Sequence, residues 1–185
     1  MTTIFIAGSI TIKRIDSLVK DRIANILDAG HRIILGDADG ADKAVQDHLV
    51  GDKRAKVTVY CSGEEPRNNV GHWPVERIST DARPGTRAFF TAKDLKMAQV
   101  ADFGLMIWDS KSTGTLSNVI ELTSGGKKSL VYINKTKEFC SVGSASHIDK
   151  LVRVMTDTAR EKAEIKINLS RKIEQLKHAQ SGFDF

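Results

Sequence analysis

The chain has 185 residues, of which 41% are hydrophobic and 28% are charged, and its formal net charge at pH 7 is +5. This balance is ordinary for a globular domain with an apolar core, and it excludes an intrinsically disordered chain. The surplus of basic residues favours anionic partners. It does not single out nucleic acid, because lysines and arginines are interleaved with acids along the chain.

The sequence has no pattern typical of secreted, membrane or metal-binding proteins. Residues 2–7 lack the basic leader of a signal peptide, and no apolar run approaches the roughly 20 residues of a membrane span. Cys61 and Cys140 lie far apart and without CxxC spacing, so neither a metal site nor a disulfide framework is predicted. We therefore expect a cytoplasmic protein that contacts no membrane and carries no metal or other cofactor.

The first third of the chain alternates short apolar runs with a segment of helical spacing. In that segment apolar residues recur at positions 15, 18, 19, 23, 26 and 27, as on one face of a helix. Gly30 is well suited to ending this helix. The predicted elements, in chain order, are a strand with its turn at 3–9, a helix at 15–29, a strand at 31–35, a helix at 41–50 and a strand at 56–60.

Residues 61–90 show no clear period and contain all three prolines of the chain. An irregular segment of this length is uncommon in a compact domain unless it is functional or disordered. Trp73 and the arginines of the segment, including Arg87, are suited to covering an anionic ligand. The composition fits a flexible surface excursion equally well, and both interpretations stay open.

The next part of the chain repeats the alternation. A helix is predicted at 91–101, a buried strand at 103–108, a helix from Leu116 to the glycines at 125–126, and a strand at 129–134. Strands that alternate with helices in this way form βαβ units. We therefore predict an α/β fold, namely a Rossmann-like three-layer domain with a mainly parallel sheet of five or more strands.

The composition changes beyond residue 139, which divides the chain into a Rossmann-like ligand-binding domain at 1–139 and a C-terminal helical extension at 140–185. Residues 141–146 are predicted to be a linker, and residues 158–161 fit a helix capping box. An apolar stripe at helical spacing starts at Ile148 and continues to about residue 178. The stripe favours packing on its own domain and homodimerisation about equally.

Three strand–loop–helix junctions contain the residue types that bind anions. Parallel sheets bind ligands at the carboxyl ends of their strands, where helix N-termini present free N–H groups. The junctions follow the strands at 3–8, 31–35 and 103–108. The candidate ligand-binding residues on them are Gly8, Ser9, Gly36, Asp39, Gly40, Ala41, Ser112, Gly114 and Thr115.

Aspartates at these junctions are the candidates for catalysis. Asp39 and Asp42 suit ribose hydroxyls, a metal or the activation of water, but capping of the following helix is the favoured role of either one alone. Asp109 stands at a strand end, where it suits a ribose hydroxyl or general-base catalysis. A turn is slightly favoured there. Asp42 and Asp109 are the two catalytic candidates, and no histidine has metal-ligand spacing.

The motifs at 36–42, 101–102, 108–109 and 112–115 together resemble the SLOG superfamily, and the similarity is greatest to its YspA/YpsA-like branch. The resemblance covers roughly residues 3–134. It implies a Rossmann-like domain that binds nucleotides or nucleotide-derived ligands. The superfamily includes phosphoribohydrolases of the LOG kind, DNA-binding relatives of the DprA kind and sensor domains, and similar domains often pair as homodimers.

Four positions depart from the patterns of these relatives. Asp37 and Ser110 stand where the family commonly has glycine, and Lys93 stands where the hydrolases have arginine. Asn118 occupies the position of the hydrolases' catalytic glutamate. Because an amide cannot exchange protons at neutral pH as a carboxylate can, the last difference argues against the hydrolases' mechanism.

The resemblance and the junctions lead to three functional hypotheses. The first is a module that senses or sequesters a nucleotide-type ligand, with its phosphates on the junctions, Trp73 on the base and Arg87 closing over the anion. The second is an enzyme that cleaves an N-glycosidic bond with Asp42 or Asp109. Nucleic-acid binding ranks last, because no basic stripe separates from the acids.

Overall fold

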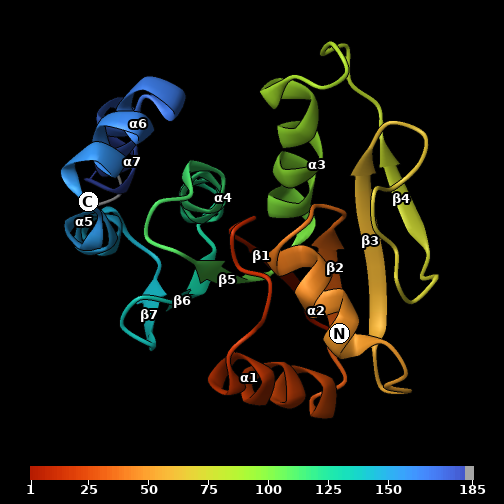
Figure 1. The fold of residues 1–185 in the computed structure, drawn as a ribbon. Coiled ribbons are helices and arrows are strands. Elements are labelled where there is room, and N and C mark those ends of the chain that lie inside the picture. The colour runs from red at the N-terminus through yellow and green to blue at the C-terminus, as the bar shows by residue number, and fades with distance from the viewer. Residues whose placement is uncertain (182–185) are drawn as a thin grey trace.

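A seven-stranded sheet with the order β4-β3-β2-β1-β5-β6-β7 lies at the centre of the protein (Figure 1). The computed structural model describes residues 1–181. All neighbouring strands are parallel except β6 and β7. The strands are β1 (Thr3–Gly8), β2 (Arg32–Gly36), β3 (Lys56–Ser62), β4 (Val75–Ile78), β5 (Phe103–Trp108), β6 (Lys128–Ile133) and β7 (Glu138–Val142).

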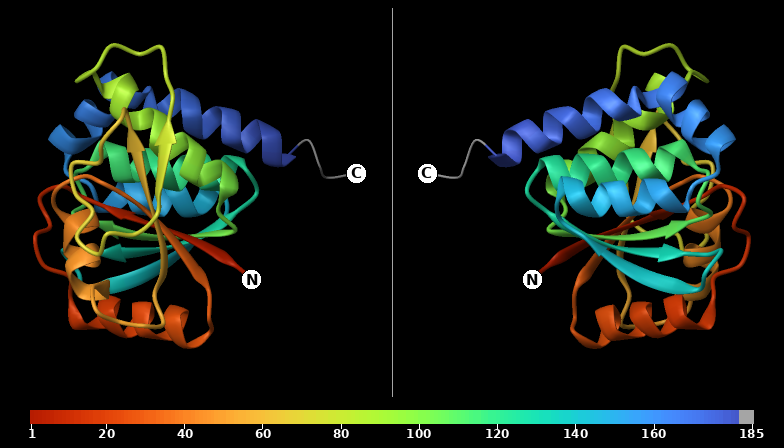
Figure 2. Two further views of the ribbon diagram at one scale, coloured as in Figure 1. Left: turned by 90° about the vertical axis from the view of Figure 1, so that its right-hand side faces the viewer. Right: turned by 90° about the vertical axis from the view of Figure 1, so that its left-hand side faces the viewer.

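Helices cover both faces of the sheet, which confirms the predicted α/β, Rossmann-like three-layer fold. Figures 1 and 2 show α1 and α2 on one face and α3 and α4 on the other, with α5–α7 beside α4. Among the described residues, no helix has the length and apolar character that a membrane span requires. The helices are α1 (Ser17–Asp28), α2 (Ala41–Leu49), α3 (Arg87–Val100), α4 (Thr113–Ser124), α5 (Ala145–Val154), α6 (Asp157–Ile167) and α7 (Leu169–Ser181).

The apolar run of β5 is buried on both faces. Leu105 and Ile107 belong to the core under α1 and α2, whereas Met106 and Trp108 belong to the core under α3 and α4. Successive side chains of a strand point to opposite faces, so a strand that is covered twice needs apolar residues at every position. This explains why the run lacks the polar alternation of a half-exposed strand.

The order of the strands reverses between β1 and β5. From β1 the chain proceeds outward through β2 and β3 to β4, and it then returns to place β5 on the other side of β1. In an open parallel sheet the crevice at such a reversal, above the carboxyl ends of the strands, is the usual place for a ligand. The junctions that follow β1, β2 and β5 therefore come together at one edge.

The segment at 61–90 is more structured than its composition predicts. β4 (Val75–Ile78) extends the sheet beside β3, and α3 starts at Arg87 rather than at residue 91. Thr86 caps this helix, since its side chain accepts a hydrogen bond from the N–H of Phe89. An edge strand with one face in solvent has no continuous apolar run, which is why β4 has a weak sequence signal.

The C-terminal part differs from the sequence-based expectation at two boundaries. Residues 141–146 are not a linker, because they contain the end of β7 and the start of α5. The helix α6 begins after Thr156, whose side chain accepts from the N–H of Ala159, and not at the predicted capping box. The edge strand β7 spans Glu138–Val142, and the division into two domains at residues 139 and 140 stays a prediction.

The apolar stripe of the C-terminal helices packs within the chain. Ile148 and Leu151 of α5, Leu169 of α7 and Trp108 of β5 belong to one buried cluster. Ile165 is the exception, since it is 83% exposed. The stripe is thus largely buried without a second copy of the chain, and a homodimer stays a prediction.

Candidate functional site

Ser9, at the first junction, is fully buried and joins β1 to β5. Its Oγ accepts a hydrogen bond from the N–H of Asp109 at 3.0 Å and lies 3.4 Å from the Oγ1 of Thr115. Gly8 is required by close packing, because a Cβ there would lie 2.5 Å from both the carbonyl oxygen of Ile107 and the Cβ of Ala41. Both residues thus hold the edge of the sheet together.

The glycines of the second junction are closed in by the protein's own groups. The N-cap residue Gly40 has a φ of +80°, and a Cβ there would clash with the backbone of Ile10. The N–H of Ala41 donates to the carbonyl of Ser9 at 3.2 Å, so it is not free for a ligand. Asp39 is exposed and accepts from the Nδ2 of Asn68 at 3.0 Å.

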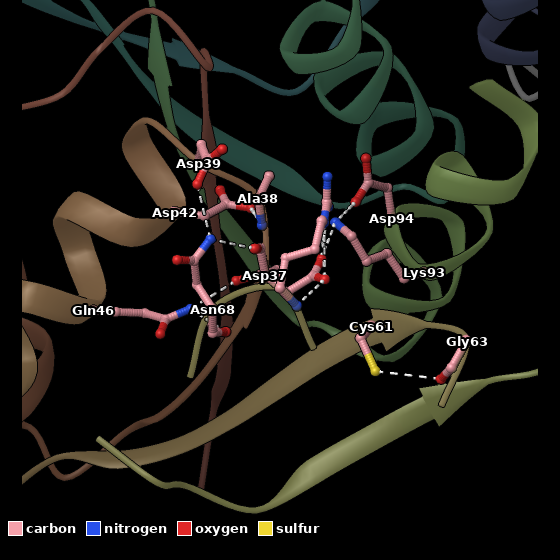
Figure 3. A network of polar contacts seen from close by, with 12 residues as sticks. Asp37, Ala38, Asp39, Asp42, Gln46, Cys61, Gly63, Asn68, Lys93 and Asp94 are labelled. Carbon is pink, nitrogen blue, oxygen red and sulfur yellow. Dashed lines mark hydrogen bonds and ion pairs between the residues drawn. The ribbon is translucent and has the colours of Figure 1, made fainter. Parts of the chain in front are cut away.

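Asp37, at the same junction, has a buried carboxylate that forms an ion pair with the partly exposed Arg67 (Figure 3). Its carboxylate accepts from the Nε and Nη2 of Arg67 at 3.0 and 2.8 Å, and the Nζ of Lys93 lies 3.8 Å away. Burial alone would raise the pKa of Asp37, but the two cations outweigh it and lower the pKa. Asp37 therefore anchors the segment after β3.

Asp42 and Lys93 form the buried part of this cluster, in which only 5% of Asp42 and 3% of Lys93 is exposed. Burial raises the pKa of Asp42 to about 7, against the opposing charge of Lys93. The Nζ of Lys93 contacts the carboxylate of Asp94 at 2.7 Å. At Gly36 a Cβ would lie 2.5 Å from Oδ2 of Asp42 and 2.6 Å from Nζ of Lys93, so this glycine makes room for the charged groups.

Asp109 forms the turn that leads to the third junction. Its Oδ1 accepts from the N–H groups of Lys111 and Ser112 at 2.9 and 2.7 Å, and its Oδ2 accepts from the hydroxyl of Thr11 at 2.8 Å. Burial alone would raise the pKa of Asp109, but these hydrogen bonds lower it. Ser110 adopts a φ of +66°, a backbone conformation that glycine adopts without strain.

The N-terminus of α4 is the open part of this edge. Ser112 is the N-cap, and its Oγ accepts from the N–H and the Oγ1 of Thr115 at 3.3 and 3.1 Å. Within the described residues, the N–H groups of Thr113 and Gly114 have no hydrogen-bond acceptor. A Cβ at Gly114 would have no neighbour nearer than 3.9 Å, so there is room for a side chain at this position.

Arg87 adds a cation to this helix end. It is the first residue of α3, and its Nη1 donates to the Oγ1 of Thr113 at 3.2 Å. The exposed Lys111 precedes the cap. The structure thus places Arg87 at the same helix end as Ser112, Gly114 and Thr115, and it adds Thr113, which lies within the 112–115 motif and is bonded to Arg87 from 26 residues away.

Trp73 lies apart from this group. It precedes β4, whose first residue Val75 pairs with Val59 in the middle of β3, so the indole is on the amino-terminal side of that strand. It packs against the core under α1 and α2. Gln46 holds the preceding segment in place by donating to the carbonyls of Gly36 and Asn68.

No protein-family model and no curated protein matches the chain. Among solved structures, it resembles DNA processing protein A from Helicobacter pylori, with 18% identity and a TM-score of 0.56 over 90% of this chain and 80% of that chain. The structural report on that protein describes its mode of binding single-stranded DNA. At this identity the likeness concerns the fold, and it agrees with the Rossmann-like domain that the SLOG resemblance implies.

Proposed function

We propose that the protein binds a nucleotide or nucleotide-derived ligand by a phosphate group at the N-terminus of α4, as a sensing or sequestering module of the YspA/YpsA-like kind. The observation that carries the proposal is the pair of N–H groups on Thr113 and Gly114 that have no acceptor among the described residues, with Arg87 bonded to Thr113 and room for a side chain at Gly114. They lie at the reversal of strand order, where α/β sheets bind ligands.

The chemistry of this helix end suits a phosphate. The partial positive charge of a helix N-terminus stabilises an anion by about 0.3–1 kcal/mol, and by up to about 2 kcal/mol where the site is partly buried. The guanidinium of Arg87 supplies charge-assisted hydrogen bonds of the kind that phosphate oxygens accept. Lys111, before the cap, adds a second exposed cation. The combination favours phosphate over a neutral ligand.

Binding is favoured over bond cleavage because the acidic side chains are otherwise engaged. Asp109 accepts hydrogen bonds from three neighbours and its pKa is lowered, which makes it a weak base. Asp42 is buried beneath the junction, and Asn118 is buried on α4. N-glycosidic cleavage therefore stays the alternative, and release of free base from nucleotides or NAD would support it.

Single-stranded nucleic acid is a second candidate ligand. The observation that favours it is the likeness in fold to DNA processing protein A from Helicobacter pylori, whose binding of single-stranded DNA has been described. A phosphodiester presents the same oxygens to the N-terminus of α4 as a mononucleotide does. Its affinity would fall steeply with salt concentration if several phosphates were contacted.

The test is a Gly114→Asp substitution, which places a carboxylate in front of the free N–H groups. Calorimetry would compare the variant with the wild type on nucleoside monophosphates, NAD and a short single-stranded oligonucleotide. We expect binding to be lost while the protein stays folded, because an acidic residue in the first turn of a helix is stabilising.

The matched control is Gly125→Asp, which makes the same change at the other end of α4. Gly125 has a negative φ, and a Cβ there would meet its nearest neighbour at 3.5 Å. Retained binding in Gly125→Asp together with lost binding in Gly114→Asp would support the site. Wild-type affinity in Gly114→Asp would remove the α4 site from consideration.

A further inference from the structure

We propose that a pocket between the β1–α1 loop and α2, lined by Lys13, Arg14, Lys20 and His48, is a second phosphate subsite. The inference depends on the proposed function for the nature of the ligand, which would carry more than one phosphate. The cationic site itself stands on separate residues.

The pocket has a volume of about 430 Å³ and draws its lining from three elements. Lys13 and Arg14 belong to the loop after β1, Lys20 to α1 and His48 to the last turn of α2, and all four are exposed. Its remaining lining residues are the buried Ile15 and Ala44, which form an apolar floor, and Asp47. A rim of basic side chains over an apolar floor presents its charge to solvent and to a ligand.

The positive charge of this pocket is not neutralised by the protein. In the part of the chain that the structure describes, Lys13, Arg14 and Lys20 form no ion pair. Asp47 lines the pocket, but its carboxylate is paired with the Nζ of Lys43 at 2.8 Å. Three cations without an ion-pair partner therefore line the pocket, and the carboxylate that lines it, Asp47, is already paired with Lys43.

The pKa of His48 depends on the charges that line the pocket. Its pKa is lowered, first by burial and then by the charge of Lys20, while Asp52 opposes the shift. Asp52 is itself paired with Arg54 at 2.6 Å. A phosphate bound among these cations would offset the effect of Lys20 and raise the pKa of His48, which makes the histidine a probe of occupancy.

The pocket shares a loop with the α4 site. Thr11, two residues before Lys13, donates to the carboxylate of Asp109, which forms the turn before α4. The loop after β1 therefore contacts the turn before α4 at Thr11 and lines the pocket at Lys13 and Arg14. A further phosphate of the ligand is the group that this cationic pocket would take. The second phosphate belongs to a nucleoside polyphosphate or a dinucleotide, or it is the next phosphodiester of a single strand. In each case the pocket would contact the same anionic phosphate oxygens.

The direct experiment follows the imidazole resonances of the full chain by NMR during pH titrations with and without inorganic phosphate. A His48→Gln variant assigns the His48 signal. We expect phosphate to raise the pKa of His48 in the wild type and to leave it unchanged in Lys13→Gln/Arg14→Gln. The control Lys162→Gln/Lys166→Gln removes the same charge from the exposed face of α6 and should behave as the wild type. A His48 pKa that does not respond to saturating phosphate would overturn the subsite.

Affinity measurements identify the source of the phosphate. For a nucleoside triphosphate, we expect Lys13→Gln/Arg14→Gln to weaken binding roughly threefold to tenfold, as expected for two exposed ionic contacts, and to leave a nucleoside unaffected. An effect on a single-stranded oligonucleotide alone would assign the pocket to a phosphodiester chain. Equal weakening for the nucleoside would contradict a phosphate subsite.

Measuring both the His48 titration and nucleotide binding in the Gly114→Asp variant distinguishes the α4 site from the pocket. If phosphate still shifts the pKa of His48 there and nucleotide binding is lost, both sites stand. If Gly114→Asp leaves nucleotide binding intact, the α4 site fails while the response of His48 still decides the pocket.

Discussion

The second and third junctions of the sheet have similar sequences but differ in how much space surrounds their glycines. Residues 36–42 and 109–115 both pass from a buried strand through aspartate and glycine into a helix. At the second junction the backbone N–H of Ala41 and the space beside Gly36 are taken up by the protein's own groups. At the third, a Cβ at Gly114 would have no neighbour nearer than 3.9 Å, and the N–H groups of Thr113 and Gly114 have no acceptor among the described residues. A glycine in the sequence thus indicates that another group can come close to the backbone. Only the structure shows whether that space is filled by the protein or is left for a ligand.

Loss of the buried cation should have the largest effect on this comparison. We expect Lys93→Met to reduce the free energy of unfolding by about 3–5 kcal/mol, because it removes the buried cation that pairs with Asp94 and Asp37 and opposes the burial of Asp42. Urea denaturation measures the loss. The control Lys43→Met breaks the exposed pair with Asp47 and should cost less than about 1 kcal/mol. A similarly small loss in Lys93→Met would mean that the cluster does not hold the second junction closed.

The raised pKa of Asp42 predicts a pH dependence on the order of a few kcal/mol. An acid whose pKa is about 7 in the folded state and about 4 in the unfolded state binds more protons when folded. Its contribution to stability therefore falls as the pH rises from about 4 to about 7, and then levels off. Lys93, Asp94 and Asp37 set this value together with burial.

Denaturant titrations of Asp42→Asn and the wild type at pH 5 and pH 8 test this dependence. The stability of the variant relative to the wild type should increase between the two pH values, because asparagine does not titrate. The exposed Asp39→Asn serves as the control and should show a constant difference. A constant difference for Asp42→Asn as well would show that its carboxyl titrates normally.

Replacing a glycine of each junction by alanine should give the smallest changes in stability. The two substitutions compare the two junctions directly. Gly36→Ala should cost about 1–3 kcal/mol, since its Cβ would overlap Asp42 and Lys93. Gly114→Ala should be neutral or stabilise α4 by up to about 1 kcal/mol, because its Cβ enters open space. Thermal unfolding of both variants measures the contrast. Equal destabilisation would contradict the difference between a closed and an open junction.

Local sequence patterns predicted the fold because each signal lies within a few neighbouring residues. Apolar runs with helical segments between them require a parallel sheet, and the strand–loop–helix order of residues 103–122 requires a helix N-terminus at the sheet edge. Element ends were less predictable. Thr86 and Thr156, which cap α3 and α6, look like many other threonines until their N–H partners are known.

The sequence by itself determined the alternating layers and placed the three glycine-containing junctions at the carboxyl edge. Only the tertiary structure decided which junction is open, because that depends on pairs far apart in the chain. Arg67 closes on Asp37 from 30 residues away, Arg87 reaches Thr113 across 26, and Lys13 faces His48 across a pocket. Such contacts depend on how α3 and the β1–α1 loop pack over the sheet, and no local pattern encodes that packing.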